Sequence, residues 1–315
     1  MSHAAEEGLV VASHGRHCVV ESADGARRIC HPRGKKNQAV AGDRVLWQPA
    51  HGGEGTIEKV LTRRNLLYRQ DEVRSKSFAA NIDQVLVLIA AEPVFSESQL
   101  ARALIAAEAA GIAPLIALNK SDLVEPFARA WQRLLPYRHM PGSAGPDSRH
   151  YGVLPLSLAH SGAVDRAALM AHLAGKATLV LGPSGAGKST LINLLIPQAR
   201  AATGEISRAL NSGKHTTTAT TWYWTDAARA TALIDSPGFQ EFGLRHLQPA
   251  DLARCMPDIG ALASQCKFYN CTHLHEPGCA VMAQVGATGS PYAISASRYK
   301  IYGELFEQLK QPPTR

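Results

Sequence analysis

The sequence lacks the marks of membrane and secreted proteins. No apolar run approaches the roughly 20 residues that a membrane-spanning helix needs, so no membrane association is expected. The stretch MSHAAEEGLVV at the N-terminus is acidic where a secretory signal peptide is basic, which favours a cytoplasmic protein. The chain also contains no internal repeat.

Cysteine is scarce, and most of it is gathered in one part of the chain. The six cysteines are Cys18, Cys30, Cys255, Cys266, Cys271 and Cys279. In a reducing compartment, a clustered subset is more typical of a metal site than of disulfide bonds. The last four cysteines therefore mark a region in which a metal site is expected.

Positive charge is in modest excess. The 315 residues carry a formal net charge of +7, with a pI of about 9.2. This balance is compatible with a polyanionic partner such as nucleic acid, although many metabolic enzymes share it. A chain of this length is expected to fold as two or three domains.

Residues 1–72 have the pattern of a small β-barrel. Short strand-like segments follow one another between Gly, Asp and Pro residues, without helical periodicity. An OB-fold is one economical form of such a barrel, and an SH3-like barrel is the alternative. Basic residues gather here and in the following linker, which suits either RNA binding or a solvated surface. They are Arg27, Arg28, Arg33, Lys35, Lys36, Arg63, Arg64, Arg69, Arg74 and Lys76.

Residues 73–243 alternate between apolar strands and amphipathic helices. The run QVLVLIAA is continuously apolar after its first residue, as expected of a strand that is buried on both faces. The next segment, SESQLARALIAAEAAG, has apolar residues at helical spacing, with Ser96 as the N-cap and Gly111 as the stop. Continued alternation predicts a parallel α/β sheet with right-handed crossovers.

Residues 244–315 change character again. The segment CKFYNCTHLHEPGC is dense in Cys and His and has little periodicity, whereas SASRYKIYGELFEQLKQ predicts a helix. This part of the chain is therefore predicted to be a third, small domain that ends in a helix.

The segment GPSGAGKS, at 182–189, fits the phosphate-loop pattern G-x-x-x-x-G-K-[ST], with a strand before it and a helix after it. Its glycines let backbone N–H groups curl around phosphate oxygens, and the helix N-terminus adds a positive field. Lys188 is expected to reach the β- and γ-phosphates, and Ser189 to ligate Mg²⁺. The expected nucleotide contacts are Gly182, Pro183, Ser184, Gly185, Ala186, Gly187, Lys188, Ser189 and Thr190.

Two further motifs choose GTP over ATP. In LNKSDL, Asp122 can accept hydrogen bonds from N1–H and the 2-amino group of guanine, both of which adenine lacks. Asn119 would support the other side of the base, and Lys120 would lie along it. In DSPG, Asp235 would hold Mg²⁺ through water, and the N–H of Gly238 would sense the γ-phosphate.

The base-reading motif precedes the phosphate loop, which reverses the order of an ordinary GTPase. A doubly wound sheet binds ligands at the carboxyl ends of its strands, so the loops must share one sheet edge but not one chain order. Chain termini usually lie close together at the surface, which makes circular permutation tolerable. In LSLAHSG, Ser157 and Leu158 are the expected third base-contacting loop.

This permuted order resembles the small-ribosomal-subunit-dependent GTPases of the RsgA (YjeQ) family. The resemblance covers essentially the whole chain and rests on NKSDL, GPSGAGKSTLIN, GKHTTT, DSPGF and CKFYNCTHLHEPGC. The sequence departs from the family pattern at Ala186, where Val is common, and at Leu158, where Ala is usual. The resemblance implies an N-terminal OB-fold, a circularly permuted P-loop GTPase domain and a C-terminal zinc-binding domain. It also implies a role in late maturation of the small ribosomal subunit, which stimulates GTP hydrolysis.

Cys266, Cys271, His273 and Cys279 offer three thiolates and one imidazole. Structural zinc takes four such ligands in a closed tetrahedron, and the family pattern that the sequence resembles matches these positions. His275 is the alternative imidazole, and Cys255 is interpreted as a small buried side chain outside the set. A single Zn²⁺ with four protein ligands would be structural rather than catalytic.

The side chain that activates water is not obvious. In Ras-type GTPases a Gln directly follows D-x-x-G, but here that position is Phe239, and Gln240 would need a different backbone path. GKHTTT is the expected switch, with Thr217 as the Mg²⁺ and γ-phosphate ligand and Thr216 as the alternative. His215 is predicted to position or deprotonate water, and a surface histidine is the competing interpretation. Together with Lys188, His215 and Thr217 form the predicted catalytic set.

Three functions remain in competition. The favoured one is a cytoplasmic, monomeric GTPase that binds the small ribosomal subunit and its rRNA and uses Mg²⁺ with GTP or GDP. The alternative is an RNA-binding assembly factor that uses GTP occupancy as a switch with negligible turnover. An ATP-dependent P-loop enzyme is the third, and the N-K-x-D motif argues against it.

Overall fold

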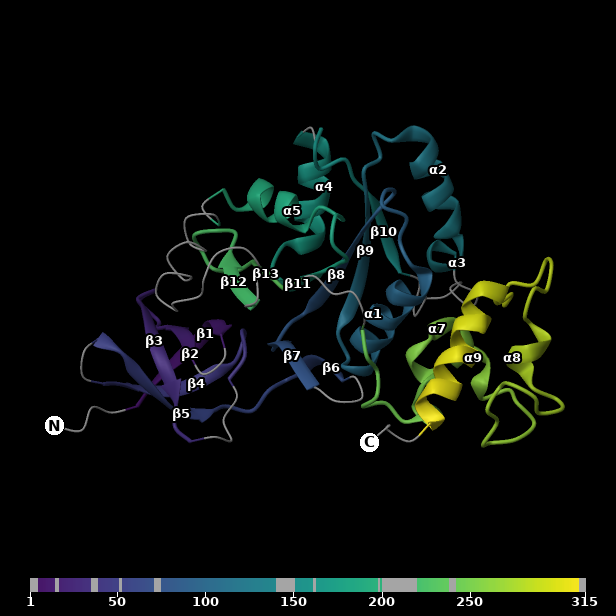
Figure 1. The fold of residues 1–315 in the computed structure, drawn as a ribbon, viewed down its shortest axis with the longest axis horizontal. Coiled ribbons are helices and arrows are strands. Elements are labelled where there is room, and N and C mark those ends of the chain that lie inside the picture. The colour runs from purple at the N-terminus through teal and green to yellow at the C-terminus, as the bar shows by residue number, and fades with distance from the viewer. Residues whose placement is uncertain are drawn as a thin grey trace.

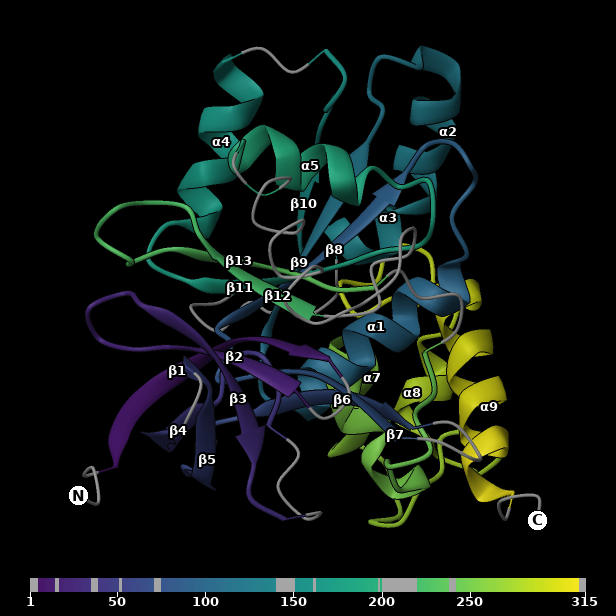
Figure 2. The same cartoon turned by 60° about the vertical axis from the view of Figure 1, so that its left-hand side comes forward.

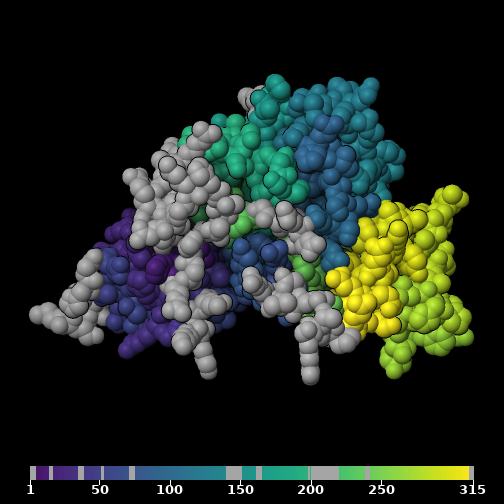
Figure 3. Space-filling model, viewed as in Figure 1, coloured from purple at the N-terminus to yellow at the C-terminus, as the bar shows by residue number. Residues whose placement is uncertain are grey.

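The computed structural model describes residues 5–14, 17–34, 39–50, 53–70, 75–139, 151–160, 163–197, 199, 220–237 and 242–311. A barrel and a C-terminal region lie on opposite sides of a central α/β sheet (Figure 1). In the space-filling view they form separate lobes at the two ends of the visible face (Figure 3). Among the described residues, no helix combines the length and apolar character needed to cross a membrane.

The first five strands close into a barrel in the order β1–β2–β3–β5–β4–β1, with β3 and β5 parallel and the other pairs antiparallel. Inward side chains such as Val10, Val20 and Trp47 fill the interior. This connectivity confirms the OB-like barrel over the SH3-like alternative. The strands are Glu6–His14, His17–Glu21, Arg27–Pro32, Arg44–Pro49 and Gly55–Val60, for β1 to β5.

A two-stranded antiparallel sheet, β6 (Leu66–Gln70) and β7 (Ser75–Ala80), follows the barrel and spans the domain boundary expected at 72/73. Its first strand also meets the chain that leaves the central domain. Gln70 N–H donates to the Gly243 carbonyl, and Arg245 N–H donates to the Gln70 carbonyl. This hairpin therefore contacts the segment where the third domain was expected to begin.

The central sheet has the order β10–β9–β8–β11–β13–β12, with β12 antiparallel to its neighbour and the remaining pairs parallel. Every residue of β8 is buried, as its apolar run predicts. The strands are Gln84–Ala90, Ala113–Asn119, Gly152–Pro155, Ala177–Leu181, Thr220–Trp224 and Ala232–Asp235, for β8 to β13.

Helices cover both faces of this sheet (Figure 2). Buried residues of α1, α2 and α3 share a core with one side of β8, while α4 and α5 cover the opposite side. The helices are Glu97–Ala109, Val124–Arg133, Leu135–Arg138, Ala163–Leu173 and Lys188–Leu195, for α1 to α5.

The spatial order of the strands confirms the permuted arrangement. β11, which carries the phosphate loop, lies between β8, from earlier in the chain, and β13, from later in it. Since these strands are parallel, the phosphate loop, the base-reading motif after β9 and the DSPG motif after β13 leave the same edge of the sheet.

The C-terminal region packs its helices against α1 and shares the core that lies beneath it. Its elements are η2 (Pro249–Asp251), η3 (Ala253–Cys255), α7 (Pro257–Ala263), α8 (Ala280–Ala283) and α9 (Ala296–Lys310). The described helices of this region therefore complete the core on one face of the sheet.

Candidate nucleotide site and metal centre

The phosphate loop joins β11 to α5, and glycine is required at two of its positions by close approach. A Cβ on Gly182 would lie 2.2 Å from the carbonyl oxygen of Leu88. Gly187 has φ +106°, and a Cβ there would lie 2.5 Å from Nδ2 of Asn119. The backbone at Gly182 therefore packs directly on the backbone of β8, and the backbone at Gly187 packs on the side chain of Asn119. The second contact brings the phosphate-binding and base-binding halves of the site together.

Lys188 begins α5 and turns back over the loop. Its ammonium donates to the carbonyl oxygens of Gly182 at 2.7 Å and Pro183 at 3.0 Å. Burial lowers the pKa of Lys188, while the nearby carboxylate of Asp235 opposes that shift. The lysine thus presents a partly desolvated positive charge within the loop.

Asp235 ends β13 beside this lysine. Burial raises the pKa of its carboxyl to about 6, although Lys188 acts in the opposite direction. The next residue, Ser236, is buried and its hydroxyl donates to the Val180 carbonyl at 2.7 Å, which ties β13 to β11. A desolvated carboxylate beside the phosphate loop has the oxygen chemistry that Mg²⁺ requires.

Asn119 connects the phosphate loop to the base loop. Its amide Nδ2 donates to the carbonyl of Ala186 at 2.9 Å, and its Oδ1 accepts from the N–H of Leu158 at 3.0 Å. The side chain is buried, with 4% relative exposure. One residue at the end of β9 therefore fixes the separation between the phosphate-binding and base-binding segments.

Asp122 faces the loop that follows β10. The hydroxyl of Ser157 donates to its Oδ1 at 2.7 Å, and this bond lowers the pKa of Asp122. His160 Nδ1 lies 3.8 Å from the other carboxylate oxygen. Lys120, between the two base-reading residues, adopts φ +69°. The carboxylate is thus held ionised, which is the form that accepts hydrogen bonds from a guanine edge.

The structure brings Asn119, Asp122, Ser157 and Leu158 together with the phosphate loop and Asp235 at one sheet edge. Sequence analysis did not identify His160 as a neighbour of Asp122. The only available signal was its position in the segment LSLAHSG, which contains the base loop. The expected switch residues His215, Thr216 and Thr217, together with Gly238, Phe239 and Gln240, lie outside the described residues.

A second cluster lies in the C-terminal region. The ligand atoms of Cys266, Cys271, His273 and Cys279 all lie within 4.8 Å of one another. Nδ1 of His273 is 3.4 Å from Sγ of Cys266 and 3.6 Å from Sγ of Cys279. Three sulfurs and one imidazole nitrogen at these distances can hold a metal ion, as the sequence predicts, and the donor set is one that zinc favours.

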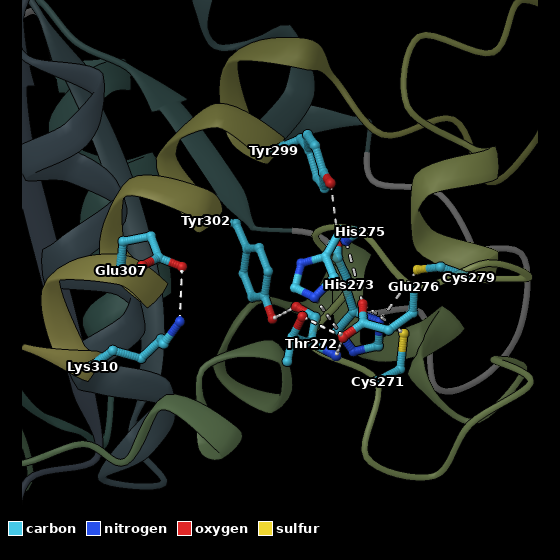
Figure 4. Close-up of polar contacts among 10 residues, drawn as sticks. All are labelled: Cys271, Thr272, His273, His275, Glu276, Cys279, Tyr299, Tyr302, Glu307 and Lys310. Carbon is cyan, nitrogen blue, oxygen red and sulfur yellow. Dashed lines mark hydrogen bonds and ion pairs between the residues drawn. The ribbon is translucent and has the colours of Figure 1, made fainter.

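Neighbouring side chains orient this cluster (Figure 4). Tyr299 and Tyr302 of α9 donate hydrogen bonds to the carbonyls of His273 at 2.7 Å and Thr272 at 2.9 Å. Glu276 accepts from the backbone N–H of Thr272 at 2.9 Å, which tightens the turn between the ligands. The two tyrosines fix the backbone beside the imidazole, a role that spacing along α9 could not reveal.

The competing metal assignments are also resolved among the described residues. His275 has a side chain that is 78% exposed and lies outside the four-residue cluster. Cys255 is buried away from the cluster, as expected of a small apolar side chain. Thus the imidazole of the cluster belongs to His273.

A phosphate loop, a D-x-P-G strand end and an N-K-x-D motif at one sheet edge, in permuted chain order, define a circularly permuted P-loop GTPase. The sequence matches the RsgA GTPase family over residues 60–245, and the chain belongs to that family. It is therefore a GTP hydrolase.

Relatives match almost the whole chain. A protein of Variovorax paradoxus named Small ribosomal subunit biogenesis GTPase RsgA is 70% identical over 305 residues, which cover 97% of this chain and 93% of that protein. Its namesake in Paraburkholderia xenovorans is 49% identical over 308 residues, with 96% and 93% covered.

Two solved structures share the architecture. The crystal structure of YloQ, a circularly permuted GTPase, is 26% identical, has a TM-score of 0.70 and covers 99% of this chain and 98% of its own. YjeQ from Thermotoga maritima is 28% identical with a TM-score of 0.71, and 98% and 99% are covered.

Proposed function

We propose that this GTPase binds the small ribosomal subunit in the cytoplasm and hydrolyses GTP to GDP and phosphate during late maturation of that subunit. The observation that carries the proposal is the 70% identity with a relative of that name over nearly the whole chain. The barrel, the permuted site and the Cys₃His cluster are all present in one chain, so each part that such a role needs is available.

Phosphate binding falls to the phosphate loop and Lys188, whose ammonium already lies against the loop carbonyls. Ser189 and Asp235 would hold Mg²⁺, and Thr217 completes the proposed set. When bound, the ion neutralises charge that develops on the phosphate oxygens. Lys188 serves the same end from the protein side, because its desolvated charge is strongest where water is excluded.

Guanine recognition falls to Asp122 and Asn119. Ser157 donates to one oxygen of Asp122 and leaves the carboxylate's remaining lone pairs for the N1–H and 2-amino donors of the base. Leu158 serves through its backbone, which Asn119 holds. Lys120 would lie along the ring. Adenine offers no matching pair of donors, so the same carboxylate excludes ATP.

Water activation is assigned to His215. Phe239 occupies the position of the Ras-type glutamine and has no group that could orient water. A histidine near neutral pH can accept a proton, and its segment GKHTTT also supplies Thr217. Docking on the small subunit would bring His215 to the water, which would explain a stimulated rather than a fast intrinsic activity.

The basic residues of the barrel and linker differ in their surroundings. Four of them each form an ion pair with a carboxylate of this chain. These four are Arg27, Arg33, Arg63 and Arg64. On the β6–β7 hairpin, Arg69 stands directly opposite Lys76. Burial and the charge of Arg69 lower the pKa of Lys76. Like charges across a ladder repel, and an RNA phosphate would relieve that repulsion.

The deciding experiment is GTP turnover with and without purified small ribosomal subunits, over a range of salt concentrations. Stimulation by small but not large subunits is expected, and His215→Ala should lower the stimulated rate roughly 10²–10⁴-fold while subunit binding with a GTP analogue persists. Lys76→Ala should weaken docking and reduce its salt slope by about one. The matched variant Lys300→Ala removes an exposed lysine that faces Glu304 at 3.9 Å and should leave the slope unchanged.

Absence of any stimulation would overturn the proposal. If subunit binding depends on the GTP analogue but turnover stays negligible, the chain is an assembly factor that uses GTP occupancy as a switch. If ATP is hydrolysed as readily as GTP, the assignment of Asp122 fails.

A further inference from the structure

The barrel and the GTPase sheet are one continuous sheet. The edge strand β12 pairs with β13 on one side and with β1 of the barrel on the other (Figures 1 and 2). Thr221 of β12 is opposite Asp235 in one ladder and opposite Ala12 in the other. Asp235 is in turn opposite Val180, on the strand that leads to the phosphate loop. One row of paired residues thus runs from the barrel through Asp235 to the phosphate-loop strand.

Among the described residues, the seam between β1 and β12 pairs Ala12 with Thr221 and Ser13 with Thr220. A side-chain contact beside these positions also holds β12 against the barrel.

A buried carboxylate provides that contact. Glu21, at the end of β2, has a side chain that is 5% exposed, and it accepts a hydrogen bond from the indole N–H of Trp224 at 2.8 Å. Arg229 lies 3.6 Å from the same oxygen, and Arg27 of the barrel donates to the other at 2.8 Å. Trp224 ends β12 and Arg229 lies in the turn before β13, so one barrel side chain contacts both the end of β12 and the turn that leads to β13.

The same turn is also seated on the barrel backbone. Gly25, between β2 and β3, has φ +91°, and a Cβ there would lie 1.9 Å from Nη2 of Arg229. Arg229 also donates to the carbonyl of Ala23 at 3.5 Å. The guanidinium therefore fills the space that the glycine leaves open, which fixes the hairpin relative to the barrel at a second point.

We propose that Glu21 is a positioning residue for Mg²⁺-dependent GTP hydrolysis: by holding the β12–β13 hairpin on the barrel, it sets the place of Asp235 at the phosphate loop. The barrel is then part of the framework of the catalytic site. Coupling of this kind is reciprocal, so Mg²⁺ and nucleotide at Asp235 tighten the seam between β12 and β1. The inference rests on the assignment of Asp235 to Mg²⁺ under the proposed function.

Glu21→Gln tests it in the full chain. Glutamine keeps an acceptor for Trp224 but removes the charge that holds Arg229 and Arg27. The Mg²⁺ concentration for half-maximal turnover should rise roughly 10-fold and kcat should fall, while GDP affinity measured without Mg²⁺ stays unchanged. Trp224→Phe, which removes the indole donor and keeps an aromatic ring, should shift the Mg²⁺ requirement in the same direction.

Hydrogen exchange gives a readout that does not depend on activity. In the unaltered chain, Mg²⁺ with a GTP analogue should slow exchange at Ala12, Ser13, Thr220 and Thr221, and Glu21→Gln should abolish that gain. The control is Glu58→Gln, which breaks another barrel ion pair, with Arg33 at 2.6 Å. It should leave both the Mg²⁺ requirement and the exchange pattern unchanged.

Asp235→Asn distinguishes a failure of the proposed role of Glu21 from a failure of the assignment of Asp235 to Mg²⁺. If Asp235→Asn raises the Mg²⁺ requirement but Glu21→Gln and Trp224→Phe do not, the seam is mere attachment and the inference fails. If Asp235→Asn has no effect on the Mg²⁺ requirement, the assignment of Asp235 fails first. If Glu21→Gln lowers both the melting temperature and the affinity for GDP, the role of Glu21 is only structural support.

Discussion

The barrel and the C-terminal region attach to the same GTPase sheet by different physical means. The barrel joins through backbone pairing at β12 and a buried carboxylate, next to the strand that carries Asp235. The C-terminal region joins through side-chain packing on α1 and through the contact of a buried arginine, Arg298, with the ring of Tyr137 in α3. The barrel thus lies beside the strand that carries Asp235, and the C-terminal region lies beside α1 and α3.

A buried arginine of the C-terminal region reaches α3 and the residue before β10. Arg298 of α9 pairs with Asp258 of α7, both 2% exposed, and its guanidinium lies 4.7 Å from the ring centroid of Tyr137 in α3. Tyr137 stacks with Tyr151, directly before β10. Backbone pairing fixes the register of the barrel on the sheet, whereas side-chain packing holds the C-terminal region by complementary shape. The two lobes should therefore respond differently to substitution.

The largest effect should come from the metal cluster. Cys271→Ser removes one of four ligands, and because metal binding is largely folding free energy, the loss is on the order of 10 kcal/mol. We expect bound zinc per chain to fall and the C-terminal region to unfold, as measured by metal analysis and circular dichroism. Cys255→Ala, a buried cysteine outside the cluster, should keep its zinc. Full zinc content in the Cys271 variant would show that the ligand set is wrong.

The buried ion pair should come second. Arg298→Met leaves Asp258 charged and without its buried partner, which costs about 3–5 kcal/mol of unfolding free energy. Replacing both residues, as in Arg298→Met with Asp258→Leu, should recover most of that loss, because an apolar pair avoids the desolvation penalty. Denaturant unfolding measures both. Arg254→Met, at an exposed pair 3.2 Å from Asp251, should cost under about 1 kcal/mol.

Adding a single methyl group at Gly42, where the barrel meets β12, should destabilise the protein. Gly42 has φ +88°, and a Cβ there would lie 2.1 Å from the carbonyl oxygen of Ala80 and 3.1 Å from the ring of Trp222. Gly42→Ala should therefore cost about 2–4 kcal/mol, from backbone strain and overpacking together. Gly34→Ala is the matched control, with φ +85° and nothing within 4 Å. Gly34→Ala should cost about 1–2 kcal/mol. If both variants lose the same stability in thermal unfolding, backbone strain alone accounts for the cost of Gly42→Ala.

The smallest expected effect is a gain rather than a loss of folding stability, and it comes from Asp235→Asn. Since burial raises the pKa of Asp235 from 3.8 to about 6, the folded apoprotein binds its proton more tightly than the unfolded chain. Its stability therefore falls as pH rises from 3.8 through 6, and the charged form is penalised at pH 7. Asp235→Asn should stabilise the nucleotide-free protein by about 1–3 kcal/mol at pH 7 while raising the Mg²⁺ concentration needed for half-maximal turnover.

The control for that prediction lies on the same hairpin. Backbone hydrogen bonds from Ala230 and Thr231 lower the pKa of Asp226, so its contribution to stability is present at neutral pH and is lost as pH falls through the folded pKa. Asp226→Asn should therefore bring no gain at pH 7. For Asp235→Asn the gain in melting temperature should shrink as pH is lowered through 6, and a gain that is independent of pH would contradict the titration.

Much of the chemistry could be predicted from the sequence, because short motifs carry it. The phosphate loop needs glycine where Gly182 and Gly187 meet neighbouring chain, and the pattern records that need directly. The four predicted zinc ligands were proposed from residue type and from resemblance, and the structure places all four within reach of one ion. The barrel and the alternation of strands and helices followed from apolar periodicity, which reflects burial at each position.

Only the tertiary structure decided how these parts combine. The strand β12 and the hairpin β6–β7 were not predicted, and the pairing of β12 with β1 joins residues more than two hundred positions apart. Local patterns report whether a side chain is buried, but they do not report what buries it. The roles of Glu21, Trp224 and Arg298 depend on partners brought together by folding, so the sequence by itself determined the motifs and the structure alone determined their coupling.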